Sequence, residues 1–343
     1  MRFIVINKKR IMNDNFFNLS NEEKLALIRK AAAQLLVSDI VIEKDIWVCW
    51  ILEKLFELPI QMAFKGGTSL SKVFNLIKRF SEDCDVTIDY RNFSKELRLE
   101  NLNKSQLKKI SEQLKEKLQI YISKTVLPHL KELISKEFDE DLFEITLSED
   151  GEQLKFYYPT LIGKADGYVR DHVLIEFGVR NSTEPFEKLS ISTYLEQVTE
   201  SKIKLPAPNI PTLSPLRTFW EKATLIHVEC HRDRFSHSPE RLSRHWYDLF
   251  MLNNSWVGEK ALSNKDILQN VVMHKKAFFN AAYANYDDCL TGKFRLIPKD
   301  KYLKDLEKDF KKMVEAEMFY EEPPTFKNIA EGLKHLEITI NKT

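Results

Sequence analysis

Two aspartates separated by one residue, Asp83 and Asp85, follow a pair of glycines in the segment AFKGGTSLSKVFNLIKRFSEDCDVTID, residues 63–89. The part SEDCDVTID alternates polar and apolar residues, which predicts a strand with both carboxylates on one face. Two carboxylates at this separation repel each other unless a cation lies between them, and Mg²⁺ favours carboxylates together with phosphate oxygens. The pair is therefore a candidate site for a divalent cation.

The glycines Gly66 and Gly67 lie between the apolar run MAFK, which predicts a strand, and an amphipathic stretch that predicts a helix. Glycine lets a phosphate approach the backbone closely, and a helix N-terminus with the hydroxyls of Thr68 and Ser69 favours an anion. Lys65 directly precedes them. Either feature alone is usually structural, but a phosphate site next to a metal-binding acid pair is what nucleotidyl transfer with two metal ions requires.

The remaining chain predicts elements that could position this segment. Residues 1–60 read as a helical N-terminal segment that includes a capping box, Ser20 and Glu23. Residues 61–205 read as a core of strands and helices, with a Lys- and Glu-rich helical insertion at about 94–138 and a hairpin around Gly151. A proline-rich stretch then leads into a helical C-terminal domain, residues 206–343. We therefore expect an α+β protein.

The composition of the 343 residues, 43% hydrophobic and 30% charged, is that of a globular chain, and it excludes a collagen-like or broadly disordered one. A net charge of +1 means that any nucleic acid would have to be bound by a local basic patch. The four cysteines form no CxxC pair, which favours a reducing compartment, and no segment has the length or apolarity of a membrane span or a signal peptide. We expect a cytoplasmic protein without a membrane partner.

The stretch FKGGTSLSKVFNLIKRFSEDCDVTI resembles the signature of the AbiEii/AbiGii-type nucleotidyltransferase toxins, a branch of the DNA polymerase β-like superfamily. Four further pieces agree with it, namely IEKDIWVCWIL, VLIEFGVR, FWEKATLIHVECHR and SRHWYDLFML, so the resemblance covers roughly residues 42–252. It implies a polymerase-β-like core with a mixed sheet, a bacterial type IV toxin–antitoxin or phage-defence context, and Mg²⁺-dependent transfer from NTP, in some members to the tRNA 3′ end.

The resemblance also assigns residues. Asp83 and Asp85 would be metal ligands and catalytic, and Glu176, the acid within VLIEFGV, would be the third ligand. Lys222 would bind the nucleotide and take part in catalysis, and Asp248 would be the late catalytic aspartate. Two ions, Mg²⁺ or alternatively Mn²⁺, would bind to the three acids. Many members of the superfamily carry Asp where this chain has Glu176, so its longer arm shifts the expected metal position.

Other polar residues are open to more than one interpretation. Lys222 lies at the margin of an apolar helical stripe, where either a triphosphate-binding or a surface lysine is found. Asp248 could instead form an i,i+4 ion pair with Arg244. The motif HVECH, with His227 and His231, has zinc-like spacing but no further ligands, so we do not expect zinc there. For Glu43, Lys44 and Asp45 we expect a role in orienting their helix and no chemistry.

The sequence leaves more than one acceptor for the nucleotide open. Two basic groups could bind RNA: the lysines of the helical insertion, which alternate with glutamates, and Arg232, Arg234, Arg241 and Arg244, which we favour because arginine pairs bidentately with phosphate. We expect NTP and tRNA or another RNA as substrates and an antitoxin as a protein partner. Alternatives are a protein or small-molecule hydroxyl as acceptor, or a nucleotide-binding module without turnover, which would have little need of three acids.

Overall fold

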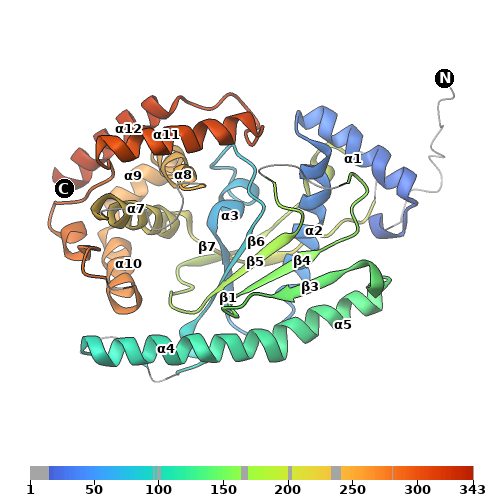
Figure 1. Ribbon diagram of the computed structural model, residues 1–343, viewed down its shortest axis with the longest axis horizontal. Coiled ribbons are helices and arrows are strands. Elements are labelled where there is room, and N and C mark those ends of the chain that lie inside the picture. Colours follow the sequence, from blue (N-terminus) through green and yellow to red (C-terminus); the bar gives the residue numbers. More distant parts are fainter. Residues whose placement is uncertain are drawn as a thin grey trace.

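The computed structural model describes residues 15–95, 97–98, 102–163, 169–199, 203–232, 241–279 and 281–342. Within these residues seven strands form one mixed sheet in the order β3-β4-β5-β2-β1-β7-β6 (Figure 1). The strands are β1 Met62–Lys65, β2 Cys84–Ile88, β3 Glu144–Leu147, β4 Gln153–Tyr157, β5 Val173–Gly178, β6 Phe186–Ser190 and β7 Asn209–Leu213. With helices on both faces, this sheet confirms the expected α+β class.

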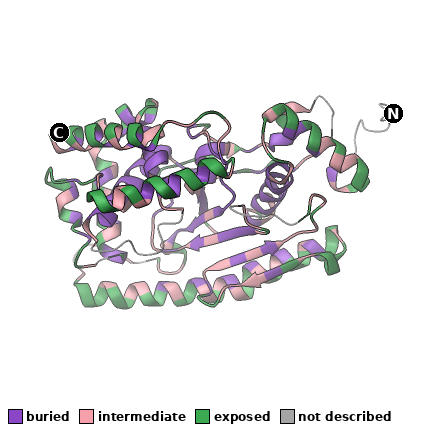
Figure 2. Cartoon of the chain, turned by 45° about the horizontal axis from the view of Figure 1, so that its top comes forward, coloured by how far each residue is buried: buried purple, intermediate pink, exposed green. Residues whose placement is uncertain are grey.

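The N-terminal helices α1 (Asn21–Leu35) and α2 (Asp39–Leu55) begin the described chain. Ser20 and Glu23 form the predicted capping box at the start of α1. Helix α2 is buried along most of its length, as the purple colouring in Figure 2 shows, because it packs against the sheet and against α1, α5 and the short helix α6 (Tyr194–Val198). Three of its buried residues are charged, Glu43, Lys44 and Asp45.

The helical insertion consists of α4 (Lys104–Tyr121), a π-helical turn (Ile122–Val126) and α5 (Leu127–Glu137), which together run along one face of the sheet (Figure 1). Its buried residues recur every four positions: Leu114, Leu118, Ile122, Val126, Leu130 and Ile134. A regular α-helix has 3.6 residues per turn, so a four-residue repeat would rotate around it, and the wider π turn reduces that rotation. Pro128 lies in the first turn of α5, where proline is tolerated.

The helices of the C-terminal half lie together at the end of the molecule opposite to α1 (Figure 1). They are α7 (Pro215–His231), α8 (Ser243–Asn253), α9 (Trp256–Ser263), α10 (Lys265–Phe278), α11 (Asp300–Glu315) and α12 (Phe326–Lys342). Ser214 caps α7 and Pro215 is its first residue, a position that favours proline. Their apolar faces form one core with Leu70 and Ile77, so this half is packed directly onto the segment that carries the glycines and aspartates.

Two boundaries differ from the expectation. The helix after the glycines, α3 (Gly66–Lys72), is shorter than the amphipathic pattern predicts, since Asn75 takes a left-handed conformation and the chain to Asp83 is irregular. The predicted core boundary at residue 205 is wrong because β7 lies beyond it and pairs with both β1 and β6. Pro211 in β7 has no N–H, and the parallel pairing with β1 extends over a single register pair. None of the helices among the described residues is long and apolar enough to cross a bilayer.

Candidate active site

A pocket of about 320 Å³ lies between the sheet and helices α7, α8 and α10. Its floor carries the three predicted acids, Asp83, Asp85 and Glu176. Strands β2 and β5 are parallel neighbours in which Asp85 is directly paired with Glu176. The structure therefore places the lone acid of VLIEFGV beside the aspartate pair, on an adjacent strand and on the same face.

The facing carboxylates of Asp85 and Glu176 carry an excess of negative charge. Burial and then the charge of Asp85 raise the pKa of Glu176 to about 7, and burial also raises the pKa of Asp85. Gln153 on β4 donates a 2.6 Å hydrogen bond from Nε2 to the Glu176 carboxylate and fixes its position. A bound cation would neutralise this pair, so the electrostatics match the proposed metal-ligand role of the acids.

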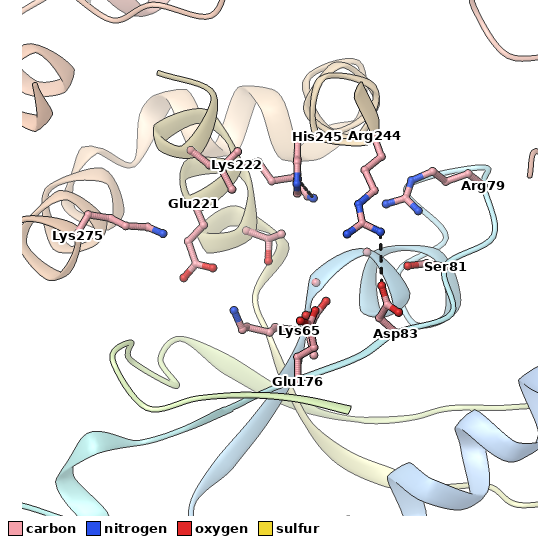
Figure 3. Close-up of a pocket in the computed structure, with 15 residues that line it drawn as sticks. Lys65, Arg79, Ser81, Asp83, Glu176, Glu221, Lys222, Arg244, His245 and Lys275 are labelled. Carbon is pink, nitrogen blue, oxygen red and sulfur yellow. Dashed lines mark hydrogen bonds and ion pairs between the residues drawn. The ribbon is translucent and has the colours of Figure 1, made fainter. Parts of the chain in front are cut away.

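Asp83 is neutralised by arginines instead. Its Oδ1 lies 2.7 Å from Nη1 of Arg170, and its Oδ2 lies 3.5 Å from Nη1 of Arg244 (Figure 3). In this arrangement the described residues contain no group of three acidic, histidine or cysteine side chains close enough to hold a metal ion. The donor set still fits Mg²⁺, since Asp83, Asp85 and Glu176 offer hard oxygens around one pocket and two of them share an unneutralised charge.

The two glycines have a steric role that the sequence did not reveal. A Cβ on Gly66 would lie 1.9 Å from Oδ2 of Asp85, and Gly66 has a φ of +80. A Cβ on Gly67 would lie 2.7 Å from both Nη2 of Arg79 and Oγ of Ser81. The glycines line the pocket, but their missing side chains first make room for Asp85 and Arg79.

The hydroxyls of Thr68 and Ser69 are a correction, because we expected them to contact an anion. Both side chains are buried, and neither lines the pocket. Thr68 donates a 2.6 Å hydrogen bond to the carbonyl of Asp83, and Ser69 donates to the carbonyl of Gly66. They hold the backbone of the two motifs together, so Thr68 positions Asp83.

Basic side chains line the rest of the pocket, above and beside the acids (Figure 3): Lys65, Arg79, Lys222, Arg244 and Lys275. Lys65 ends β1 beside Asp85, and Lys222 projects from α7. The Nε of Arg244 is buried and has no hydrogen-bond partner among the described residues. An acidic floor beneath several cations suits a ligand that contains both phosphate and a metal ion.

Asp248 is not part of the pocket wall. It is fully buried, pairs with Arg79 through both oxygens at 2.8 Å, and pairs with Lys222 at 2.7 Å. Burial alone would raise the pKa of Asp248, but Arg79 and Lys222 outweigh it and hold the pKa well below the usual range. The ion pairs of Asp248 are thus with Arg79 and Lys222 and not with Arg244, and through them Asp248 positions two cations that line the pocket.

The four arginines proposed for RNA do not form one surface. Arg244 lies inside the pocket, and Arg241 pairs at 2.9 Å with the buried Glu82. Arg232 caps α7, where it pairs with Glu229 at 3.2 Å and lies 4.7 Å from the ring centre of Tyr283. Arg234 falls outside the described residues. Of the described three, Arg232 is therefore the one whose partners come neither from the pocket acids nor from Glu82.

The motif Glu43–Lys44–Asp45 has a definite structural role. Glu43 accepts hydrogen bonds from the backbone N–H of Leu161 and the hydroxyl of Thr160, both at 2.6 Å. Asp45 binds Lys72 and the backbone N–H of Tyr194. These contacts attach separate segments to α2, which agrees with the expected orienting role.

Lys44 connects this motif to the pocket. Its Nζ lies 2.6 Å from Glu82, which also accepts from the backbone N–H of Arg170 and from Arg241. Glu82 directly precedes Asp83, and Arg170 contacts Asp83. No local sequence pattern predicts that Lys44 and Glu82 pair, because they are 38 residues apart.

His227 and His231 do not form a zinc site. The two ring nitrogens of His227 bind the carbonyl of Asn285 and the backbone N–H of Arg295, while Nδ1 of His231 lies 2.8 Å from the carbonyl of His227. Burial lowers the pKa of His227 to about 4, so it is a neutral residue that joins α7 to the chain that follows α10.

A sheet that presents acids to a pocket lined by lysines and arginines suits a protein that acts on phosphate esters and anhydrides. The comparison with protein families gives a particular family. Residues 50–332 match the model of the nucleotidyl transferase AbiEii toxin, type IV toxin–antitoxin system, and the chain belongs to that family. This assignment confirms the resemblance seen in the sequence.

Two solved structures are similar to the chain at low identity. MenT4, a nucleotidyltransferase toxin from Mycobacterium tuberculosis H37Rv, is 16% identical with a TM-score of 0.44, and the match covers 94% of this chain and 98% of MenT4. JHP933 from Helicobacter pylori is 14% identical with a TM-score of 0.42, and the match covers 89% and 93% of the two chains. Among curated proteins, none matches.

Proposed function

We propose that this chain is a Mg²⁺-dependent nucleotidyltransferase that transfers a nucleotide from NTP to the 3′ hydroxyl of an RNA. The RNA that we propose as acceptor is a tRNA. It would act as the toxin of a bacterial toxin–antitoxin or phage-defence system, in the cytoplasm and with an antitoxin as protein partner. The observation that carries this proposal is the pocket in which Asp83, Asp85 and Glu176 face Lys222 and Arg244, within a chain of the AbiEii family.

Each side chain of the pocket has a part in this reaction. Asp83, Asp85 and Glu176 would hold Mg²⁺, or Mn²⁺ in its place, and the ion would neutralise charge that develops on the phosphate oxygens. Lys222 and Arg244 bind the triphosphate, and Asp248 keeps Lys222 oriented toward it. Lys65 contributes a further positive charge beside Asp85.

Nucleotide transfer is a single displacement at the α-phosphorus of the NTP. The oxygen of the acceptor hydroxyl forms a bond to the α-phosphorus, the bond between the α-phosphorus and its bridging oxygen breaks, and pyrophosphate leaves. The proton of the hydroxyl passes to the carboxylate of Glu176, which lies beside Asp85 at the floor of the pocket. Rate enhancement then comes mainly from positioning and charge neutralisation.

The test is to incubate the purified protein with total bacterial RNA, Mg²⁺ and each of the four α-³²P NTPs in turn. Label in a tRNA-sized band with one or more NTPs supports the proposal, and the same reaction in EDTA tests the need for a metal. Asp85→Asn serves as the inactive control. Label on protein would replace the RNA acceptor by a protein hydroxyl, and no label with any NTP would reject nucleotide transfer.

A further inference from the structure

An exposed aromatic ring lies directly after helix α10. Phe279 caps the C-terminus of this helix and is 41% exposed. The guanidinium carbon of Arg180 lies 4.9 Å from its ring centre, and Nζ of Lys275 lies 4.8 Å from it. Lys275 precedes Phe279 by one helical turn, whereas Arg180 follows strand β5. We call these three residues the Phe279 platform.

The platform is continuous with the pocket. Lys275 itself lines the pocket, on the side away from Arg79 (Figure 3). Burial lowers the pKa of Lys275 to about 8, and within the described residues it forms no ion pair. Glu221 also lines the pocket, but its carboxylate accepts hydrogen bonds from Arg217 and Asn181. An amine in this position can bind a phosphate without first breaking an ion pair.

The chemistry of the platform is that of a site for a nucleobase. Proteins bind single-stranded nucleic acid by stacking bases on aromatic rings or on the plane of an arginine, with cations on the backbone phosphates. The platform provides a ring, a guanidinium and a separate amine next to a pocket that suits a polyphosphate. Trp256 is also exposed, with Lys260 at 5.0 Å from its ring, but neither residue lines the pocket.

The position of Arg180 indicates which base is bound. Arg180 lies four residues after Glu176 on the continuous chain that leaves β5. Glu176 is the group that accepts the proton of the attacking hydroxyl in the proposed function. Lys222 and Arg244, which bind the triphosphate there, belong to α7 and α8. Because Arg180 leaves the strand that carries the proposed proton acceptor, we assign the platform to the acceptor, and the titration with a nucleoside triphosphate described below tests this assignment.

We propose that Arg180, Lys275 and Phe279 bind the 3′-terminal nucleotide of a single-stranded RNA acceptor, with its base stacked on Phe279 or Arg180 and a phosphate on Lys275. The inference rests on the proposed function for its assignment to the acceptor. Arg180 and Phe279 lie outside the lining of the catalytic pocket, and Lys275 belongs to both sites. The inference therefore extends the binding surface for the substrate beyond that pocket.

The test uses a short single-stranded RNA that ends in a 3′-terminal 2-aminopurine riboside, whose fluorescence is quenched when the base stacks. Titration with the full chain in EDTA measures binding without turnover. We expect quenching with the natural chain and with Phe279→Tyr. Phe279→Leu should lose the quenching and weaken the affinity for this RNA about tenfold, in keeping with the contribution of one stacked base. Circular dichroism checks that each variant is folded.

Trp256→Leu is the matched control, since it removes an exposed ring that also has a lysine over it. Equal losses in Trp256→Leu and Phe279→Leu would overturn the proposal, as would unchanged quenching in Phe279→Leu. A second titration with 2-aminopurine riboside triphosphate distinguishes the two nucleobases, and quenching of the triphosphate alone would overturn the assignment to the acceptor.

Failure of the proposed function gives a different result. If RNA is never labelled in the presence of Mg²⁺ but quenching depends on Phe279, the platform stands as an RNA-binding site and the transfer reaction is rejected. If RNA is labelled while Phe279→Leu changes neither the quenching nor the KM for RNA, the platform alone is rejected. In an active enzyme we expect Phe279→Leu to raise the KM for RNA and to leave the KM for NTP unchanged.

Discussion

Two groups of buried charges in this molecule differ in how completely they are paired. On α2, each of Glu43, Lys44 and Asp45 has at least two polar partners supplied by other segments. In the pocket, Asp85 and Glu176 face each other, and both have a raised pKa. Burying a charge costs free energy that only good partners offset, so the fully paired group is a structural element.

Burying Asp85 and Glu176 side by side costs free energy that no ion pair within the described residues offsets. Asp85 and Glu176 repel each other, and within the described chain Lys65 and Lys275 form no ion pair. Burial raises the pKa of Glu43 and Asp45 as well, so the pocket differs from α2 in the mutual repulsion of its acids, an arrangement that is expected where a ligand neutralises the charge. The comparison therefore separates charges that hold the fold from charges that bind substrate and metal, although both are buried.

The largest expected effect is on catalysis, with Asp85→Asn. The substitution keeps the size of the side chain but removes a proposed metal ligand, so nucleotide transfer should fall by about a thousandfold or more. The metal-free protein should be as stable as the natural chain or more so, because the repulsion with Glu176 disappears. Asp287→Asn, at an exposed ion pair with Lys276, is the control and should retain activity.

This prediction is checked by the RNA-labelling rate and by urea denaturation in EDTA. A variant that keeps full activity would remove Asp85 from the metal site. A variant that unfolds much more readily than the natural chain would show that Asp85 belongs with the paired, structural charges.

Much of the pocket could be predicted from the sequence because the residues concerned lie in locally readable patterns. The alternation in SEDCDVTID and the lone acid in VLIEFGV place Asp83, Asp85 and Glu176 on strand faces. The pairing of β2 with β5 and the contact between Lys44 and Glu82 depend on the packing of distant segments, which periodicity does not report. Periodicity alone could therefore identify these residues but not show which of them come together, and the grouping of the three acids came from the family resemblance.

Other misses have specific causes. Pro211 and its neighbours read as a linker because proline usually interrupts a central strand. Asp248 and Arg244 are four residues apart on a helix, so an ion pair was a reasonable expectation, yet Arg79 offers Asp248 a bidentate contact and Asp83 attracts Arg244. Lys275 lies in an ordinary amphipathic helix, and no local signal marks it as a pocket residue.

The next largest effect concerns the paired group, with Lys44→Met. Removing Lys44 leaves the buried carboxylate of Glu82 with Arg241 as its ion-pair partner and leaves the carbonyl of Arg170 without its donor, so the free energy of unfolding should fall by about 2–3 kcal/mol. Lys108→Met breaks a surface pair with Glu112 and should change stability by less than about 1 kcal/mol. Urea denaturation measures both.

A second substitution sharpens this result. Adding Glu82→Gln to Lys44→Met measures the coupling of the pair: because both substitutions remove the same ion pair, the cost of the double variant should be smaller than the sum of the two single costs. If Lys44→Met costs no more than Lys108→Met, the paired charges of α2 do not hold the fold, and the comparison loses one of its sides.

The pH dependence of stability tests the charge of the pocket. Glu176 has a pKa of about 7 in the folded protein against 4.5 for the unperturbed group, so the folded state binds its proton more tightly than the unfolded state does. The resulting stabilisation is fully present below about pH 4.5 and is lost as the pH rises through about 7. Glu176→Gln should therefore lose less stability between pH 4.5 and pH 8 than the natural chain.

The measurement is urea denaturation at both pH values in EDTA, with Glu149→Gln in the exposed hairpin turn as the control. The control should follow the natural chain. Parallel curves for the natural chain and Glu176→Gln would mean that Glu176 is not held in a charge-rich pocket.

The smallest expected effect belongs to Arg232, which is paired like the charges of α2 but lies at the surface. Its ion pair with Glu229 and its contact with Tyr283 leave guanidinium N–H groups that a phosphate can share. Arg232→Gln should therefore weaken RNA binding only severalfold and reduce the slope of log affinity against log salt by about one. Filter binding of a labelled RNA at several salt concentrations decides it: an unchanged slope for Arg232→Gln would mean that a charge paired within the protein does not also bind RNA, and the acceptor path would then depend on the Phe279 platform.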